Sequence, residues 1–172
     1  PEHVGIVIAG GYDQSGLICW SPPLESVVIL LHMVKTAGIV VIGNEILSGR
    51  TRDENALYFL KQLRALGVDV RKVSVVPDEL SAIRDEVRTF SSKFDFVFTS
   101  GGIGPTHDDV TIAGIAAAFK KGICRAPELV LALERYYQDA LNETMLQMAD
   151  VPEGAVLIGE EEALFPVVVV EN

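Results

Sequence analysis

The fold is decided by the stretch from Phe94 to Thr111, which reads F-D-F-V-F-T-S-G-G-I-G-P-T-H-D-D-V-T. Its first five residues are aromatic or β-branched around one aspartate, and this run predicts a buried strand. A glycine-rich turn follows, and apolar residues at helical spacing begin at Ile112. A strand, a glycine turn and a helix N-terminus together often hold a phosphate, because successive backbone N–H groups and the helix dipole face one anion. We therefore expect the ligand site in the loop from Thr99 to Thr111.

Two well-known phosphate-binding fingerprints do not fit this loop. A dinucleotide-binding G-x-G-x-x-G counted from Gly102 needs a third glycine where His107 stands, and the G-K-[ST] of a P-loop is absent. What remains is a nest of glycines, followed by Asp108 or Asp109 as the N-cap of the next helix. Two interpretations of these aspartates stay open, a capping role alone or a contact with the ligand.

The residues around this stretch alternate between strand and helix patterns. Pro127 suits the first position of a further helix, running to about Asn142. The predicted strands are 38–42, 68–76, 94–98, 155–158 and 167–170, the last two as a hairpin-like extension, and the predicted helices include 53–66, with Asp53 as a cap, and 80–90. This order predicts right-handed crossovers and a three-layer α/β fold, with a mostly parallel sheet flanked by helices.

Polar residues follow three of the predicted strands. They are Asn44 and Glu45, Asp78 and Glu79, and Asp108 and Asp109. The carboxyl ends of parallel strands meet at one edge of a sheet, so we expect these groups to converge there. Carboxylates beside a phosphate repel it unless a divalent cation lies between them, and Mg²⁺ is held in this way by one or two carboxylates plus phosphate oxygens. The sequence therefore predicts a phosphate-bearing ligand and Mg²⁺.

Composition limits the class of partner. The chain has 172 residues, 49% of them hydrophobic, which is enough for one domain with a substantial core. A net charge of −10 argues against binding to nucleic acid or to an anionic membrane, because both need a positive field. Cys19 and Cys124 are too far apart for a C-x-x-C site. This cysteine usage fits a reducing compartment, and we expect a cytoplasmic location, with mitochondria as the alternative.

Residues 1–35 differ from the remainder, and we assign them no role, taking 36–172 as the domain. Gly5–Ala9 predicts a strand, and the following Gly10–Gly16 is interpreted as a surface turn in preference to a pyrophosphatase-type loop. The apolar run Val27–Leu31 is too short to span a bilayer.

The run from Gly101 to Thr111 resembles the G-G-x-G-P-T-x-D-D-x-T signature of the molybdopterin-binding domain family. That family contains molybdenum-cofactor adenylyltransferases and CinA-like proteins. Segments 42–49, 53–55 and 75–79 are most similar to the first domain of eukaryotic FAD synthases within the family. The resemblance extends from about Ala37 to the end of the chain. The family continues beyond this point into another strand and a Leu-Pro-Gly-x-Pro loop, so we expect the domain to be incomplete at its C-terminus.

The resemblance implies an α/β domain that is often a homo-oligomer and binds a nucleotide, flavin or pterin phosphate. It implies catalytic or Mg²⁺-binding roles for Asp78 and Asp109. The implied phosphate- or nucleotide-binding residues are Ser100, Gly101, Gly102, Gly104, Thr106, Thr111, Asn44 and Glu45. The ligand is then FAD, FMN with ATP, or molybdopterin. Three functions remain open: a FAD synthase domain that hydrolyses FAD or another nucleotide pyrophosphate, a non-catalytic binding or oligomerisation module, and a molybdopterin adenylyltransferase. The domain that makes FAD from FMN and ATP has no counterpart in these residues.

Overall fold

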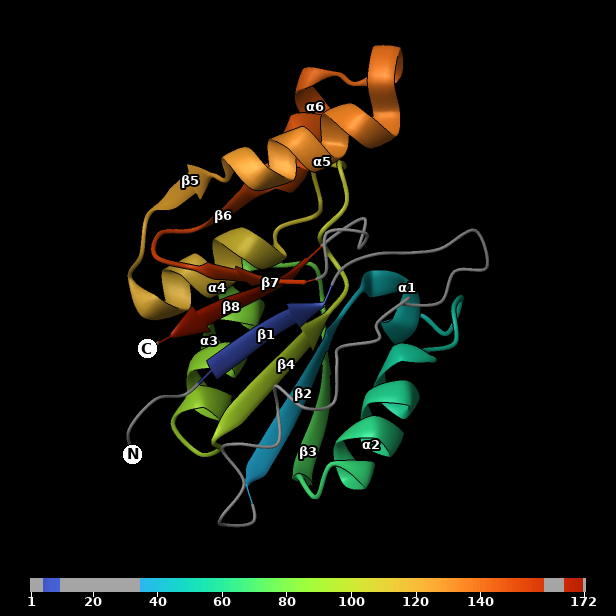
Figure 1. Ribbon diagram of the computed structural model, residues 1–172. Coiled ribbons are helices and arrows are strands. Elements are labelled where there is room, and N and C mark those ends of the chain that lie inside the picture. Colours follow the sequence, from blue (N-terminus) through green and yellow to red (C-terminus); the bar gives the residue numbers. More distant parts are fainter. Residues whose placement is uncertain (1–4, 10–34, 160–165, 172) are drawn as a thin grey trace.

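A six-stranded sheet forms the centre of the computed structural model, which describes residues 5–9, 35–159 and 166–171 (Figure 1). The strands lie in the order β3-β2-β4-β1-β8-β7. Their bounds are β1 Gly5–Ala9, β2 Thr36–Ile42, β3 Asp69–Val76, β4 Phe96–Ser100, β7 Val156–Ile158 and β8 Val167–Glu171. The four strands from β3 to β1 are parallel, whereas β8 is antiparallel to both of its neighbours. The prediction of a mostly parallel sheet is confirmed, and so is the β7–β8 hairpin.

Helices cover both faces of the sheet, which gives the three layers that were predicted (Figure 1). One face packs against α2, Asn55–Ala65, through Ala56, Phe59 and Leu63. The core on the other face contains buried residues of α3 (Leu80–Ser91) and α4 (Thr111–Phe119), and it extends to Leu129 and Leu133 of α5 (Pro127–Tyr137). The parallel strand β2 contributes to both cores, because its alternate residues point to opposite faces. Its near-continuous apolar sequence is thus explained by burial on two sides.

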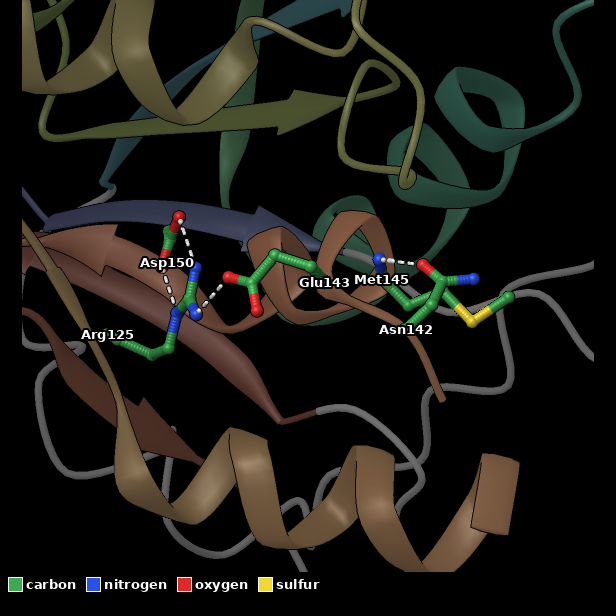
Figure 2. A network of polar contacts seen from close by, with 5 residues as sticks. All are labelled: Arg125, Asn142, Glu143, Met145 and Asp150. Atoms are coloured by element: carbon green, nitrogen blue, oxygen red, sulfur yellow. Dashed lines mark hydrogen bonds and ion pairs between the residues drawn. The ribbon is translucent and has the colours of Figure 1, made fainter. Parts of the chain in front are cut away.

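A small ribbon lies apart from the main sheet. It pairs β5, Ile123–Arg125, with β6, Asp150–Pro152. Short helical turns connect α5 to β6: η3 Gln138–Ala140, α6 Glu143–Leu146 and η4 Gln147–Ala149. The predicted continuation of α5 to Asn142 is wrong, because Gln138 has a φ of 46° and leaves the helix. Figure 2 shows Arg125 reaching Asp150 (2.9 Å) and Glu143 (3.1 Å), which ties the ribbon to α6.

The predicted strand Gly5–Ala9 is confirmed and lies inside the main sheet. It pairs with β4 in parallel, with Ala9 opposite Ser100, and with β8 in the antiparallel direction. The interpretations made of Gly10–Gly16 and Val27–Leu31 concern segments outside the described residues. Within the described parts of the chain, every helix is too short or too polar to cross a membrane.

Candidate functional site

The loops predicted to carry the site lie at one edge of the sheet. The register pairs Ile42 with Val76 and Val41 with Ser100, so β2, β3 and β4 end side by side. The segment after β2, where the polar residues Asn44 and Glu45 were noted, contains a one-turn helix, α1 (Asn44–Leu47). The carboxyl edge of a parallel sheet is the place where such folds bind ligands. The structure therefore brings the segments after the three strands together, as the sequence predicted.

The glycine loop after β4 needs glycine at two consecutive positions. Gly101 and Gly102 have positive φ values of 97° and 63°. A Cβ atom on Gly101 would lie 2.0 Å from the carbonyl oxygen of Ile42, and one on Gly102 would lie 2.4 Å from Thr111 Oγ1. Any side chain would collide with these neighbours as well as strain the backbone. The loop is thus held tightly against the end of β2.

Thr111, the first residue of α4, fastens this loop to the helix. Its hydroxyl donates to the carbonyl oxygen of Gly101 (2.8 Å), and its amide donates to that of Gly102 (3.1 Å). The residue is completely buried. Both carbonyl groups, which would repel an anion, are therefore occupied.

Among the described residues, none accepts a hydrogen bond from the amides of Gly102, Ile103 or Gly104. Amides of this kind, next to a helix N-terminus, suit a phosphate.

Asp78 links the segments after β2 and β3. Its Oδ2 atom accepts a hydrogen bond of 2.7 Å from the backbone amide of Asn44. Its Oδ1 atom lies 3.5 Å from the position of a Cβ on Gly102 and so borders the glycine loop. Asn44 enters the site here through its backbone. The carboxylate of Glu45 folds back over Gly43, where a Cβ would lie 2.6 Å from Glu45 Oε1.

Asp109 does not cap α4, and neither does Asp108. The N-cap position belongs to Val110, which has no capping side chain, so this part of the prediction is wrong. The reason is local: Asp109 Oδ2 accepts hydrogen bonds from the amide (2.9 Å) and the hydroxyl of Thr106, and these bonds close a turn within the loop. The same oxygen lies 2.9 Å from a Cβ position on Gly104. Asp109 thus shapes the second half of the loop.

Ser100 has a partner that was not predicted. The residue ends β4, is only 3% exposed, and accepts a 3.0 Å hydrogen bond from Asn55 Nδ2 at the start of α2. The N-cap position of this helix belongs to Glu54, one residue after the predicted Asp53, but Asp53 Oδ1 still accepts from the first amides of the helix, at Asn55 (3.0 Å) and Ala56 (3.2 Å). A polar side chain at the first position of a helix that follows a parallel strand was the available signal, because that end of the helix adjoins the carboxyl edge of the sheet.

The carboxylate oxygens near the loop are of the ligand type that Mg²⁺ binds. In the described part of the chain, Asp78 and Asp109 each keep one carboxylate oxygen without a hydrogen-bond partner. No group of three or more His, Cys, Asp or Glu residues within the described ranges is arranged to hold a metal ion. Mg²⁺ accepts as few as one or two carboxylates when phosphate oxygens and water complete its shell. The magnesium site therefore stays a prediction.

Comparison with known proteins points to one family. Residues 38–169 match the family model described as "Probable molybdopterin binding domain". The chain is 51% identical over 102 residues to a probable FAD synthase of Caenorhabditis briggsae, covering 59% of this chain and 20% of that protein. It is 38% identical over 134 residues to a protein of Archaeoglobus fulgidus, covering 78% of this chain and 58% of that protein. The chain thus spans about a fifth of the worm protein and somewhat over half of the archaeal one.

A solved structure supports the same grouping. The protein CinA from Thermoplasma acidophilum, described as having unknown function, superposes with a TM-score of 0.70 at 32% sequence identity. The match covers 77% of this chain and 79% of the CinA chain. The overall arrangement of strands and helices therefore belongs to an architecture already observed by experiment.

Proposed function

The chain belongs to the family of probable molybdopterin-binding domains, and on that premise we propose that it is a FAD synthase-type domain that binds a nucleotide pyrophosphate and hydrolyses it with Mg²⁺. FAD is the first substrate we propose, with ADP-ribose as a second member of the same chemical class. The likeness to the probable FAD synthases of worms supports this choice of ligand.

The observation that carries the proposal is the glycine loop itself. Its carbonyl groups at Gly101 and Gly102 are bonded to Thr111, while the amides of Gly102, Ile103 and Gly104 have no acceptor among the described residues. This polarity favours a ligand with negative charge on adjacent oxygens. A pyrophosphate presents such oxygens on two linked phosphorus atoms. Because the chain has a net charge of −10, it does not attract an anion at long range, and the groups of the loop itself must bind the ligand.

Hydrolysis of FAD breaks one P–O bond of the pyrophosphate bridge. A water molecule supplies the oxygen that joins the attacked phosphorus, and FMN and AMP are the products. In the proposal, the loop amides hold one phosphate and orient the bridge, and Asp78 stands beside Gly102 on the β3 side of the loop. Asp78 Oδ2 stays on the Asn44 amide, so its Oδ1 is the oxygen that faces the ligand.

Mg²⁺ would be held by Asp78 Oδ1 and by the corresponding oxygen of Asp109. When bound, it supplies charge neutralisation between the carboxylates and the phosphates. Thr106 fixes the other oxygen of Asp109 through its amide and hydroxyl, so the orientation of this carboxylate is set before any ligand arrives. Such preorganisation lowers the cost of reaching the productive arrangement.

Incubation of the chain with FAD and Mg²⁺ tests the proposal. We expect equal amounts of FMN and AMP, with the rate lost in Gly101→Ala because its Cβ would meet the Ile42 carbonyl oxygen at 2.0 Å. Calorimetry with FAD, ADP-ribose and molybdopterin gives the binding constants in parallel. A chain that neither binds nor cleaves FAD or ADP-ribose contradicts the proposal, and transfer of AMP to molybdopterin would replace it with cofactor synthesis.

The second candidate is a binding module without turnover. It is favoured by Asp109, whose Oδ2 atom is used within the loop, and by the lack of a larger cluster of metal-binding side chains among the described residues. This candidate predicts tight binding of FAD with no FMN released at any Mg²⁺ concentration. The same two measurements therefore separate it from the hydrolase.

A further inference from the structure

We infer that Asn55 is a positioning residue of the ligand site, which acts by turning the hydroxyl hydrogen of Ser100 toward the bound phosphate. The inference rests on the proposed function and adds a residue to it. The observation is the hydrogen bond of 3.0 Å from Asn55 Nδ2 to Ser100 Oγ, between residues 45 positions apart in the sequence.

Asn55 is not needed to cap its own helix. The first amides of α2, at Asn55 and Ala56, are already satisfied by Asp53 Oδ1 at 3.0 and 3.2 Å. An asparagine at a helix start usually bonds to the local backbone. Here its side chain crosses instead to the end of β4, where the glycine loop begins. The capping by Asp53 is what frees Asn55 for this contact.

Ser100 is buried, at 3% exposure, and its backbone directly precedes Gly101. A serine hydroxyl has one hydrogen to donate and two lone pairs to accept. The Asn55 amide occupies a lone pair, and no group in the described ranges accepts the hydroxyl hydrogen of Ser100. Occupation of the lone pair on the α2 side directs this hydrogen away from α2. In this inference, the hydrogen then faces the phosphate bound along the glycine loop, which begins at the next residue, Gly101.

A donor of this kind adds to the loop amides and favours an anion. Asparagine is the suitable residue for it, because its amide nitrogen donates and carries no charge. An aspartate of the same shape could only accept. It would take the hydrogen of Ser100 for itself and place a negative charge close to the phosphate, so Asn55→Asp separates the donor role from mere packing.

The test measures binding of FAD and of ADP-ribose by calorimetry, with Mg²⁺ present, for the wild type, Asn55→Ala, Ser100→Ala and the double variant. We expect Asn55→Ala to weaken binding about tenfold, the equivalent of one hydrogen bond to a charged group. The double variant should bind no more weakly than Ser100→Ala alone. Asn55→Asp should bind more weakly than Asn55→Ala.

Asn142→Ala is the matched control. This asparagine caps α6 by accepting a 3.0 Å hydrogen bond from the amide of Met145 (Figure 2), and no hydrogen bond in the described residues joins it to Ser100 or to the glycine loop. We expect it to lose thermal stability and to keep the affinity of the wild type. The melting temperatures of the four Asn55 and Ser100 proteins, measured without ligand, should be non-additive because the two side chains are in contact.

Three results would overturn the inference while leaving the proposed function intact. The first is that Asn55→Ala lowers the affinity equally in the wild type and in the Ser100→Ala variant. The others are wild-type affinity in Asn55→Asp and additive changes in melting temperature for Asn55→Ala and Ser100→Ala. If the wild type binds neither FAD nor ADP-ribose, the proposed function fails and the role of Asn55 fails with it. The two failures are distinguished by whether the wild type binds.

Discussion

Asp95 joins the amino ends of β2 and β4, at the edge of the sheet opposite the glycine loop. Its Oδ2 atom accepts hydrogen bonds from the amide (2.8 Å) and the hydroxyl (2.7 Å) of Thr36, and its Oδ1 accepts one from Lys35 Nζ (3.1 Å). The backbone hydrogen bond from Thr36, then its hydroxyl and the Lys35 ammonium, lower the pKa of Asp95 to about 2. The carboxylate form is therefore favoured by folding.

Replacement of Asp95 by Asn should cost about 1 kcal/mol of unfolding free energy at pH 7, a value reduced because the side chain is 37% exposed and solvent screens it. Since the folded pKa is lower than the unfolded one, this stabilisation is present above the unfolded value of 3.8 and disappears as pH falls toward 2. Urea unfolding of both proteins between pH 7 and pH 3 measures the difference. A constant gap across this range would show that charge is not its origin.

Thr99 presents the opposite case, a buried hydroxyl without a partner. It is completely buried in β4, and its Oγ1 atom has no hydrogen-bond partner among the residues that the structure describes. Thr99→Val keeps the shape and removes the unsatisfied group, so we expect a gain of about 1 kcal/mol in unfolding free energy. Thermal and urea unfolding provide the measurement.

Thr111→Val is the matched control for this change. Thr111 is also fully buried, but its hydroxyl donates to the Gly101 carbonyl oxygen at 2.8 Å. Its loss should destabilise the protein by about 1–3 kcal/mol, because a carbonyl is left unsatisfied. Equal effects of the two substitutions would contradict the assignment of partners.

At the scale of elements, α3 and α4 approach closely because α4 carries a glycine at the contact. A Cβ on Gly114 would lie 2.5 Å from Ile83 Cγ2 and 2.8 Å from Ile83 Cβ. Gly114→Ala should therefore destabilise the protein by about 1–3 kcal/mol, although alanine is the better helix former. In an Ile83→Ala background the cost should shrink, since the nearer atom, Cγ2, is removed and only the contact with Cβ remains. A double-mutant cycle by urea unfolding decides this, and an additive result would contradict the close contact.

The sequence predicted those elements whose periodicity matches their burial. In α3, Ile83, Val87 and Phe90 are all fully buried at helical spacing, and the predicted stripe located the helix correctly. The ribbon β5–β6 was missed because all three residues of β5 are exposed, so no alternation marks it. The early end of α5 was missed because Gln138 adopts its positive φ without a glycine or proline nearby to signal it.

The candidate site divides in the same way. Gly101 and Gly102 are neighbours in one loop, so the sequence alone predicted a glycine turn there, and both residues have a positive φ. The contacts from Asn55 to Ser100 and from Asn44 to Asp78 join segments separated by 45 and 34 positions, and only the assembled sheet brings them together. The position of Asp109 suited an N-cap, but its carboxylate accepts a hydrogen bond from the amide of Thr106 within the loop instead.

At the scale of the whole molecule, β1 lies in the interior of the sheet. From the sequence we expected residues 1–35 to stand apart from the domain, but Gly5–Ala9 is paired on both sides, with β4 and with β8. Through β1, the hairpin β7–β8 is joined to the parallel strands, because the sheet order is β4-β1-β8-β7. The N-terminal strand thus connects two parts of the sheet that do not otherwise pair in the described residues.

Val7→Pro tests this connection through the backbone alone. Val7 stands opposite Phe98 on one side and Val169 on the other. Proline has no amide hydrogen and interrupts the ladder of an interior strand, at a cost of about 3 kcal/mol or more. We expect one cooperative unfolding transition, shifted as a whole to lower urea, with loss of hydrogen-exchange protection in β4 and β8 together. If residues 1–35 formed a separate segment, the substitution would leave the transition of residues 36–172 at the wild-type midpoint, and β1 would then make no contribution to the stability of the sheet.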